Sequence, residues 1–141
     1  MSEIREARLQ KAKSLVIKGF ASYAESFNNS HNTQFLIQKF DYLENGQEED
    51  FSVSIAGRVL AKRIMGKIAF FTISDQEGQI QLYLDKRIIN FNLETQKFLS
   101  FEDIKEIVDI GDWIGVYGTI KKTNKGELSI KVEKWEMLSK S

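Results

Sequence analysis

The sequence contains no cysteine and no proline, and it has a single histidine, His31. Without cysteine, disulfide bridges, thiolate metal sites and cysteine nucleophiles are excluded. No apolar run approaches the roughly 20 residues that a membrane-spanning helix requires. The first residues, MSEIREARLQKAK, are charged and lack the apolar core of a secretion signal. These absences predict a cytoplasmic protein that does not enter a membrane.

An excess of charge of either sign is also missing. The 141 residues include 20 basic and 20 acidic side chains, so the formal net charge is zero. Proteins that bind nucleic acid through bulk positive charge are strongly basic, and this chain is not one of them. The balance does not exclude a local basic patch. The length suits one domain with a modest core.

The first third of the chain has helical periodicity. Apolar residues from Leu9 onward follow one stripe, which predicts a helix over residues 3–18 that Gly19 ends. Its opposite face is basic, and this face is either solvated or in contact with backbone phosphates. The small polar residues 21–32 predict a loop. A second helix is predicted for residues 33–45, with Thr33 as its cap.

From Phe51 onward the hydrophobic period changes from helical spacing to two. Strands are predicted over residues 53–61, 68–74, 79–84, 113–122 and 127–135, with a loop at 62–67. The turn sequence DQEG joins the second and third strands into a hairpin. Residues 86–108 lose the alternation, and a helix is predicted for 100–112, capped by Ser100 and Asp103.

Five antiparallel strands with a helix between the third and fourth match the OB-fold, a small Greek-key barrel. The predicted fold class is therefore mainly β, with N-terminal helices preceding the barrel. We expect residues 1–50 to form a helical extension and residues 51–141 to form the barrel domain.

A closed small barrel fills its interior with side chains, so strand parity predicts which residues face inward. The predicted interior residues are Ala69, Phe71, Ile73, Ile80, Leu82, Leu84, Ile114, Val116, Ile120, Leu128, Ile130 and Val132. The opposite parity places Phe70, Thr72, Gln79, Gln81, Tyr83, Glu127, Ser129 and Lys131 outside.

An aromatic ring on the outside of such a barrel can stack on an unpaired base, and this fold commonly binds single-stranded nucleic acid. Gln81 adds an amide that both donates and accepts, which suits recognition of a base edge. Basic side chains that could hold phosphates follow the first strand, namely Arg58, Lys62, Arg63 and Lys67. A second basic run, KKTNK, lies at 121–125.

Each of these residues also has an ordinary structural interpretation. Phe70 is a core residue if the N-terminal helices cover it, and Gln81 and Glu127 alone are common surface residues. His31 is expected to have a structural or solvated role. The conjunction of aromatic, amide and basic groups on one face favours the nucleic-acid interpretation.

Residues 55–84 resemble the anticodon-binding domain of bacterial-type lysyl-tRNA synthetase, a class II enzyme. The shared pattern is a GR strand, then [KR]R-x-MGK, F-x-T-x-x-D and G-x-IQLY. Residues 111–141, with GD-x-[IL]-G and GELS, and residues 8–20, with RL-x-K, are similar to the same family. The MGK and GELS segments distinguish this family from the aspartyl and asparaginyl enzymes.

The resemblance implies roles for individual residues. Phe70 matches the phenylalanine that stacks on the central anticodon uridine, and Gln81 matches the glutamine that bonds that base. Arg63 and Glu127 match residues implicated in anticodon contacts. Arg58 and Lys67 are further candidates for nucleic-acid binding, although Arg58 could equally be structural.

The implied function is recognition of the tRNA-Lys anticodon stem-loop within a homodimeric lysine–tRNA ligase. No catalytic constellation is apparent in the sequence, and no cofactor is expected here, because ATP and magnesium belong to the family's catalytic domain. Two alternatives stay open at this point. One is a free-standing single-strand binder with little base preference, and the other is a protein-interaction domain.

Overall fold

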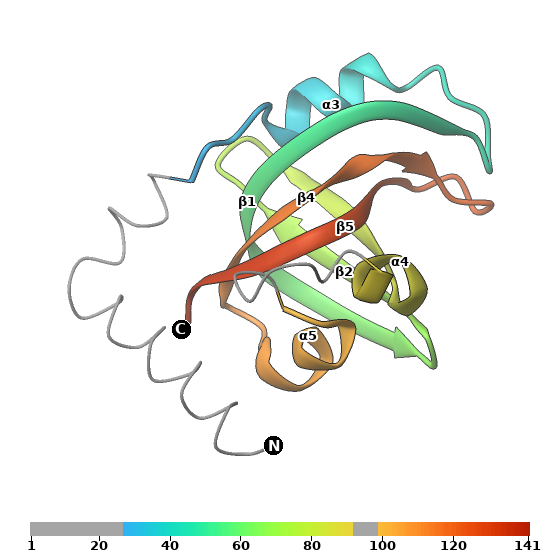
Figure 1. The fold of residues 1–141 in the computed structure, drawn as a ribbon. Helices are drawn as coiled ribbons and strands as arrows, with labels where there is room; N and C mark the ends of the chain where they lie inside the picture. Colours follow the sequence, from blue (N-terminus) through green and yellow to red (C-terminus); the bar gives the residue numbers. More distant parts are fainter. Residues whose placement is uncertain (1–26, 92–98) are drawn as a thin grey trace.

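The computed structural model describes residues 27–91 and 99–141, so the helix predicted for residues 3–18 lies outside them. The described part is a closed barrel of five strands with short helices around it (Figure 1). In chain order the elements are α3 (Thr33–Lys39), β1 (Glu48–Met65), β2 (Ile68–Ser74), β3 (Gln79–Asp85), α4 (Lys86–Phe91), α5 (Phe101–Ile107), β4 (Trp113–Lys122) and β5 (Leu128–Ser139).

The strands are ordered β1-β2-β3-β5-β4, and β4 pairs with β1 to close the barrel. Neighbouring strands run antiparallel except β3 and β5, which are parallel over a short stretch. This topology confirms the predicted mainly-β barrel with helical structure between the third and fourth strands.

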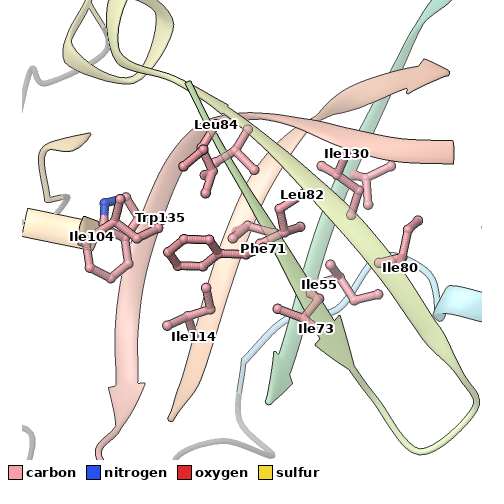
Figure 2. Close-up of a cluster of buried hydrophobic side chains, with 14 of the residues drawn as sticks. Ile55, Phe71, Ile73, Ile80, Leu82, Leu84, Ile104, Ile114, Ile130 and Trp135 are labelled. Carbon is pink, nitrogen blue, oxygen red and sulfur yellow. The ribbon is translucent and has the colours of Figure 1, made fainter. Parts of the chain in front are cut away.

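The barrel interior is filled by the side chains that parity assigned to it (Figure 2). Phe71, Leu82 and Val132 have no exposed surface, and of the predicted set Leu128 alone is only partly buried. Helices close the two ends of the barrel, with α3 at one end and α5 at the other (Figure 1). Trp135 extends the core toward α5, and its indole Nε1 donates to the Ser100 carbonyl at 3.1 Å.

Strand β1 is much longer than predicted because it serves two neighbours in turn. Its first part pairs with β4 and its last part with β2, and the ladder with β2 shifts between Val59 and Ala61. Such a bulge re-aims the side chains that follow it. The predicted loop at 62–67 is therefore wrong up to Met65, and only residues 66–67 form the turn.

Gly118 allows the closest approach between β4 and β5. A Cβ atom at this position would lie 2.1 Å from the carbonyl oxygen of Lys131. Because no real side chain tolerates that separation, glycine is required here for the two strands to keep their pairing.

The helices differ from prediction at their ends. α3 stops at Lys39 rather than residue 45, and its cap is Asn32, whose side chain accepts from the Phe35 amide at 2.8 Å. α5 has the predicted capping box of Ser100 and Asp103 but ends at Ile107 rather than at residue 112.

Helix α4 is absent from the sequence-based prediction. It starts directly after Asp85, whose carboxylate accepts from the Arg87 amide at 2.9 Å. This aspartate before an apolar pair is the signal that could have identified it.

Asp75 connects α3 to the turn of the β2–β3 hairpin. Its carboxylate accepts from the Thr33 amide and hydroxyl at 2.9 and 2.8 Å, and from the amides of Glu77 and Gly78 at 2.8 and 2.9 Å. Burial alone would raise the pKa of Asp75, but these hydrogen bonds outweigh it and hold the pKa below its usual value.

We expect Asp75→Asn to lower the free energy of unfolding by about 1–3 kcal/mol at pH 7, because the amide cannot satisfy all four donors. The native pKa of Asp75 is depressed, so its stabilisation is present above the unfolded-state pKa of about 4 and is lost as pH falls through the native pKa. The difference between wild type and variant should therefore shrink below about pH 4.

Urea unfolding followed by tryptophan fluorescence measures both effects. Glu77→Gln, which removes the same charge from an exposed position in the same turn, is the control and should cost less than about 0.5 kcal/mol. Equal costs for the two variants would show that Asp75 does not hold the helix to the hairpin.

Candidate nucleic-acid interface

Phe70 lies on the outer side of β2 and is partly exposed. Its neighbours across the sheet are Arg63 on β1 and Tyr83 on β3. The guanidinium carbon of Arg63 lies 5.1 Å from the Phe70 ring centroid. The Tyr83 ring centroid lies 5.8 Å from it, with the ring planes tilted by 54°. Phe70 thus sits between a cation and a second aromatic ring, outside the buried core of the described residues.

Gln81 lies on the same face and is a diagonal neighbour of Phe70, since Phe70 pairs with Tyr83 and Thr72 pairs with Gln81. Diagonal neighbours on a sheet are about 7 Å apart, within reach of a single base. The Gln81 amide nitrogen Nε2 donates to the Ser129 hydroxyl at 2.9 Å, and that hydroxyl donates to the Glu127 carbonyl at 3.2 Å.

This chain of bonds fixes the orientation of the Gln81 amide. If the amide were flipped, its oxygen would face Ser129, and the hydroxyl would have to abandon Glu127 to donate to it. The observed orientation uses one amide hydrogen. Among the described residues no other bond of this side chain is present, so one N–H and the oxygen Oε1 are available to another molecule.

The remaining predicted residues lie at different distances from this centre. Glu127 is exposed just before β5, and its backbone carbonyl accepts from the Ser129 hydroxyl that Gln81 contacts. Lys67 is exposed in the turn between β1 and β2. Arg58 pairs with Ser74, four residues along β2 from Phe70 and therefore about 13 Å away. Its guanidinium lies 5.7 Å from the Trp113 ring centroid, so Arg58 is not part of the group around Phe70.

Lys62 corrects the sequence analysis, which grouped it with the phosphate-binding residues. The bulge in β1 turns its side chain toward the end of the barrel, where its ammonium donates to the Val108 carbonyl at 2.5 Å and the Lys105 carbonyl at 3.3 Å. Lys62 therefore binds backbone carbonyls at the end of α5. The same bulge places Arg63 opposite Phe70, whereas the sequence analysis had put Arg63 in a loop.

Two lysines and one glutamate next to Tyr83 were not recognised as a group from the sequence. The ammonium of Lys121 on β4 lies 5.2 Å from the Tyr83 ring centroid. Glu48 at the start of β1 bridges Lys121 at 3.2 Å and Lys131 at 2.5 Å. The hydrogen bond from Lys131, opposed by partial burial and aided by Lys121, holds the pKa of Glu48 below its usual value.

The groups on this surface are suited to binding. Aromatic rings, an oriented amide and cations are the groups that recognise unpaired nucleotides. In residues 27–91 and 99–141 no group of three or more histidine, aspartate or glutamate side chains could hold a metal ion. No described helix is long and apolar enough to cross a membrane.

Comparison with known proteins agrees with this geometry. Residues 53–138, more than half of the chain, match the model of the OB-fold nucleic acid binding domain family. The chain belongs to this family. The predicted fold and the predicted class of ligand, nucleic acid, are thereby confirmed for this OB-fold domain.

The full length of this OB-fold chain is also similar to part of several lysine–tRNA ligases. It is 91% identical to that of Prochlorococcus marinus strain MIT 9312 and 88% identical to that of strain MIT 9301. A more distant relative, the lysine–tRNA ligase of Synechococcus sp. strain RCC307, is 49% identical. The chain spans 28% of the length of the two Prochlorococcus relatives and 26% of the Synechococcus one. The resemblance to lysyl-tRNA synthetases that the motifs indicated is confirmed.

Two adjacent phenylalanines allow the assigned faces to be tested. Phe71→Ala should lower the free energy of unfolding by about 3–5 kcal/mol, because it empties part of a closed core. Phe70→Ala should cost only about 1 kcal/mol, since it removes only partly exposed cross-strand contacts, with Arg63 and Tyr83. Urea unfolding of both variants measures the difference, and Phe71→Leu replaces Phe71→Ala if the latter does not fold. Similar costs at the two positions would place Phe70 in the core and contradict the outer-face assignment.

Proposed function

We propose that this domain reads the anticodon of tRNA-Lys as part of a lysine–tRNA ligase. The observation that carries the proposal is the juxtaposition of the partly exposed Phe70 ring with the oriented Gln81 amide on the outside of the barrel. The similarity of the whole chain to lysine–tRNA ligases supports it. In this proposal Arg63 and Glu127 contact the anticodon loop at either side of that pair, and Lys67 meets its backbone.

The physical basis is a division of labour between ring and amide. Phe70 stacks on the central anticodon base, which is sequence-tolerant because every base has a π-face. Gln81 supplies the preference for uridine, whose Watson–Crick edge offers a carbonyl acceptor to the amide N–H and an N–H donor to the amide oxygen. Cytosine presents an amino donor and a ring-nitrogen acceptor at the same two positions. To match them, the Gln81 amide would have to turn over and break its hydrogen bond to Ser129.

The catalytic activity named for the relatives belongs to a longer protein than this domain. The lysine–tRNA ligase relatives are more than three times as long as this chain. We infer that attachment of lysine, with ATP and magnesium, belongs to the rest of such a protein, which would act in the cytoplasm as a homodimer. The domain itself is expected to hold the anticodon stem-loop and not to aminoacylate.

The proposal predicts how the 141-residue chain binds a 17-nucleotide anticodon stem-loop with UUU in its loop. Phe70→Ala should weaken binding about 5- to 150-fold, the loss expected for one base–aromatic stack. Phe91→Ala is the matched control, because this ring is 83% exposed on α4 and lies outside the proposed site. Fluorescence anisotropy measures the affinities at one fixed salt concentration. Equal binding by Phe70→Ala and wild type would refute the stacking role.

The preference for uridine gives a separate prediction. Wild type should bind the UUU loop more tightly than a UCU loop by about 5- to 150-fold, as expected for one bidentate base contact. Gln81→Ala and Ser129→Ala should both reduce that ratio toward one, since the first removes the amide and the second releases its orientation. Gln79→Ala, exposed on the same strand, should leave the ratio unchanged. If wild type binds both loops equally, the domain is a single-strand binder without base preference.

A further inference from the structure

Tyr83 presents a second aromatic surface beside Phe70. The two rings lie on neighbouring strands with centroids 5.8 Å apart, and Tyr83 is partly exposed like Phe70. A ring that served only to support Phe70 would need no cations around it. Tyr83, however, has the Lys121 ammonium 5.2 Å from its centroid, and Lys131 is its partner on β5.

The two lysines are held by one carboxylate. Glu48 contacts Lys131 through one oxygen and Lys121 through the other, so its two oxygens bridge two ammonium groups. A phosphodiester has two equivalent charged oxygens and can make the same bridging contact. The depressed pKa of Glu48 keeps it ionised at neutral pH, where its single negative charge pairs with both ammonium groups and offsets one of their two positive charges. Glu48 therefore makes the kind of bridging contact that a backbone phosphate could make.

We propose that Tyr83, Lys121 and Lys131 form a second nucleotide site next to Phe70, in which an RNA phosphate replaces Glu48 between the two lysines. The occupant is a nucleotide that flanks the one stacked on Phe70, with its base against the Tyr83 ring. Charge complementarity and continuity with the Phe70 surface identify this occupant as single-stranded RNA. The inference rests on the proposed function, because it takes the Phe70 nucleotide as its neighbour.

The exchange explains why Glu48 is compatible with an RNA-binding surface. Two unpaired lysines beside a tyrosine would attract any polyanion. Glu48 makes them available only to a ligand whose phosphate is positioned to compete with it, so the site adds to a strand already placed on Phe70. Its exposed side chain, 45% accessible, can move aside without disturbing the barrel interior.

A double-mutant cycle between protein and RNA tests the stacking part. The protein variants are Tyr83→Ala and Tyr83→Phe, with Tyr83→Leu as a second variant that keeps apolar bulk without an aromatic face. The RNAs are the anticodon stem-loop with an intact UUU loop and two versions that carry an abasic nucleotide immediately before or after the central uridine. Affinities are measured by fluorescence anisotropy with the 141-residue chain.

On the intact loop, Tyr83→Ala and Tyr83→Leu should bind about 5- to 100-fold more weakly, whereas Tyr83→Phe should bind like wild type. On one of the abasic loops the loss should disappear, because the base that Tyr83 contacts is no longer there. The inference is overturned if Tyr83→Leu binds the intact loop as wild type does, or if its loss is the same on all three RNAs. Phe70→Ala is measured in parallel on the intact loop. If it binds that loop as tightly as wild type does, the result counts against the proposed function instead.

The exchange with Glu48 has its own measurement. Glu48→Gln should bind the intact loop several-fold more tightly and should steepen the dependence of log affinity on log salt by about one, because the phosphate no longer has to displace a carboxylate whose charge offsets one phosphate contact in wild type. Glu44→Gln makes the same charge change at an exposed position outside the site and should leave the slope unchanged. Weaker binding by Glu48→Gln, or equal slopes for the two variants, would show that Glu48 only ties β1 to β4 and β5.

Discussion

The structure depends on filling the interior of a closed barrel with every second side chain of its strands. Because side chains such as Phe71, Leu82 and Ile130 are fully buried in that space, their neighbours in sequence point outward. An aromatic residue such as Phe70 is thereby held at the surface, at the cost of exposing part of its ring to water. The rigid core also fixes the backbone beneath the surface, so the ring and the Gln81 amide are positioned before any ligand arrives.

The positive charges on this surface are paired with a ring or a carboxylate and do not form an excess of one sign. The chain has no net charge, and the cations nearest the aromatic rings are each occupied. Arg63 lies over Phe70, while Lys121 and Lys131 are bridged by Glu48. Such a surface does not attract polyanions strongly at long range. In the proposed function, recognition would therefore depend on close contacts, which favour selectivity over non-specific binding.

The sequence predicts some parts of this arrangement better than others. Alternation within residues 68–74 and 79–84 is enough to place Phe70 and Gln81 on one face, because nothing changes the register of that hairpin. One strand earlier the bulge between Val59 and Ala61 reverses the parity, so Lys62 turns to the end of the barrel and Arg63 joins Phe70. A bulge depends on which strands lie on either side, and a local pattern does not contain that information.

Contacts across the barrel are unpredictable for the same reason. Glu48 and Lys131 are 83 residues apart in sequence, and they meet only because β1 closes the barrel on β4, which in turn pairs with β5. In the sequence, Glu48 lies in the acidic run QEED at 47–50, between the second predicted helix and the first predicted strand, and nothing there indicates its distant partners. Helix α4 was not predicted for a different reason. Its six residues are too few to show a recognisable helical period of apolar side chains.

The parallel pairing of β3 and β5 runs directly beneath the proposed RNA surface. It comprises three residue pairs, Gln81 with Ser129, Leu82 with Ile130 and Tyr83 with Lys131, joined across 48 residues of chain. Parallel pairing is slightly less stable per residue than antiparallel pairing, and pairing between segments distant in sequence is slow to form. A strand of RNA lying across this junction would contact both sides of it at once. Its binding energy would then also oppose opening of the barrel, so ligand affinity and resistance to local unfolding would rise and fall together.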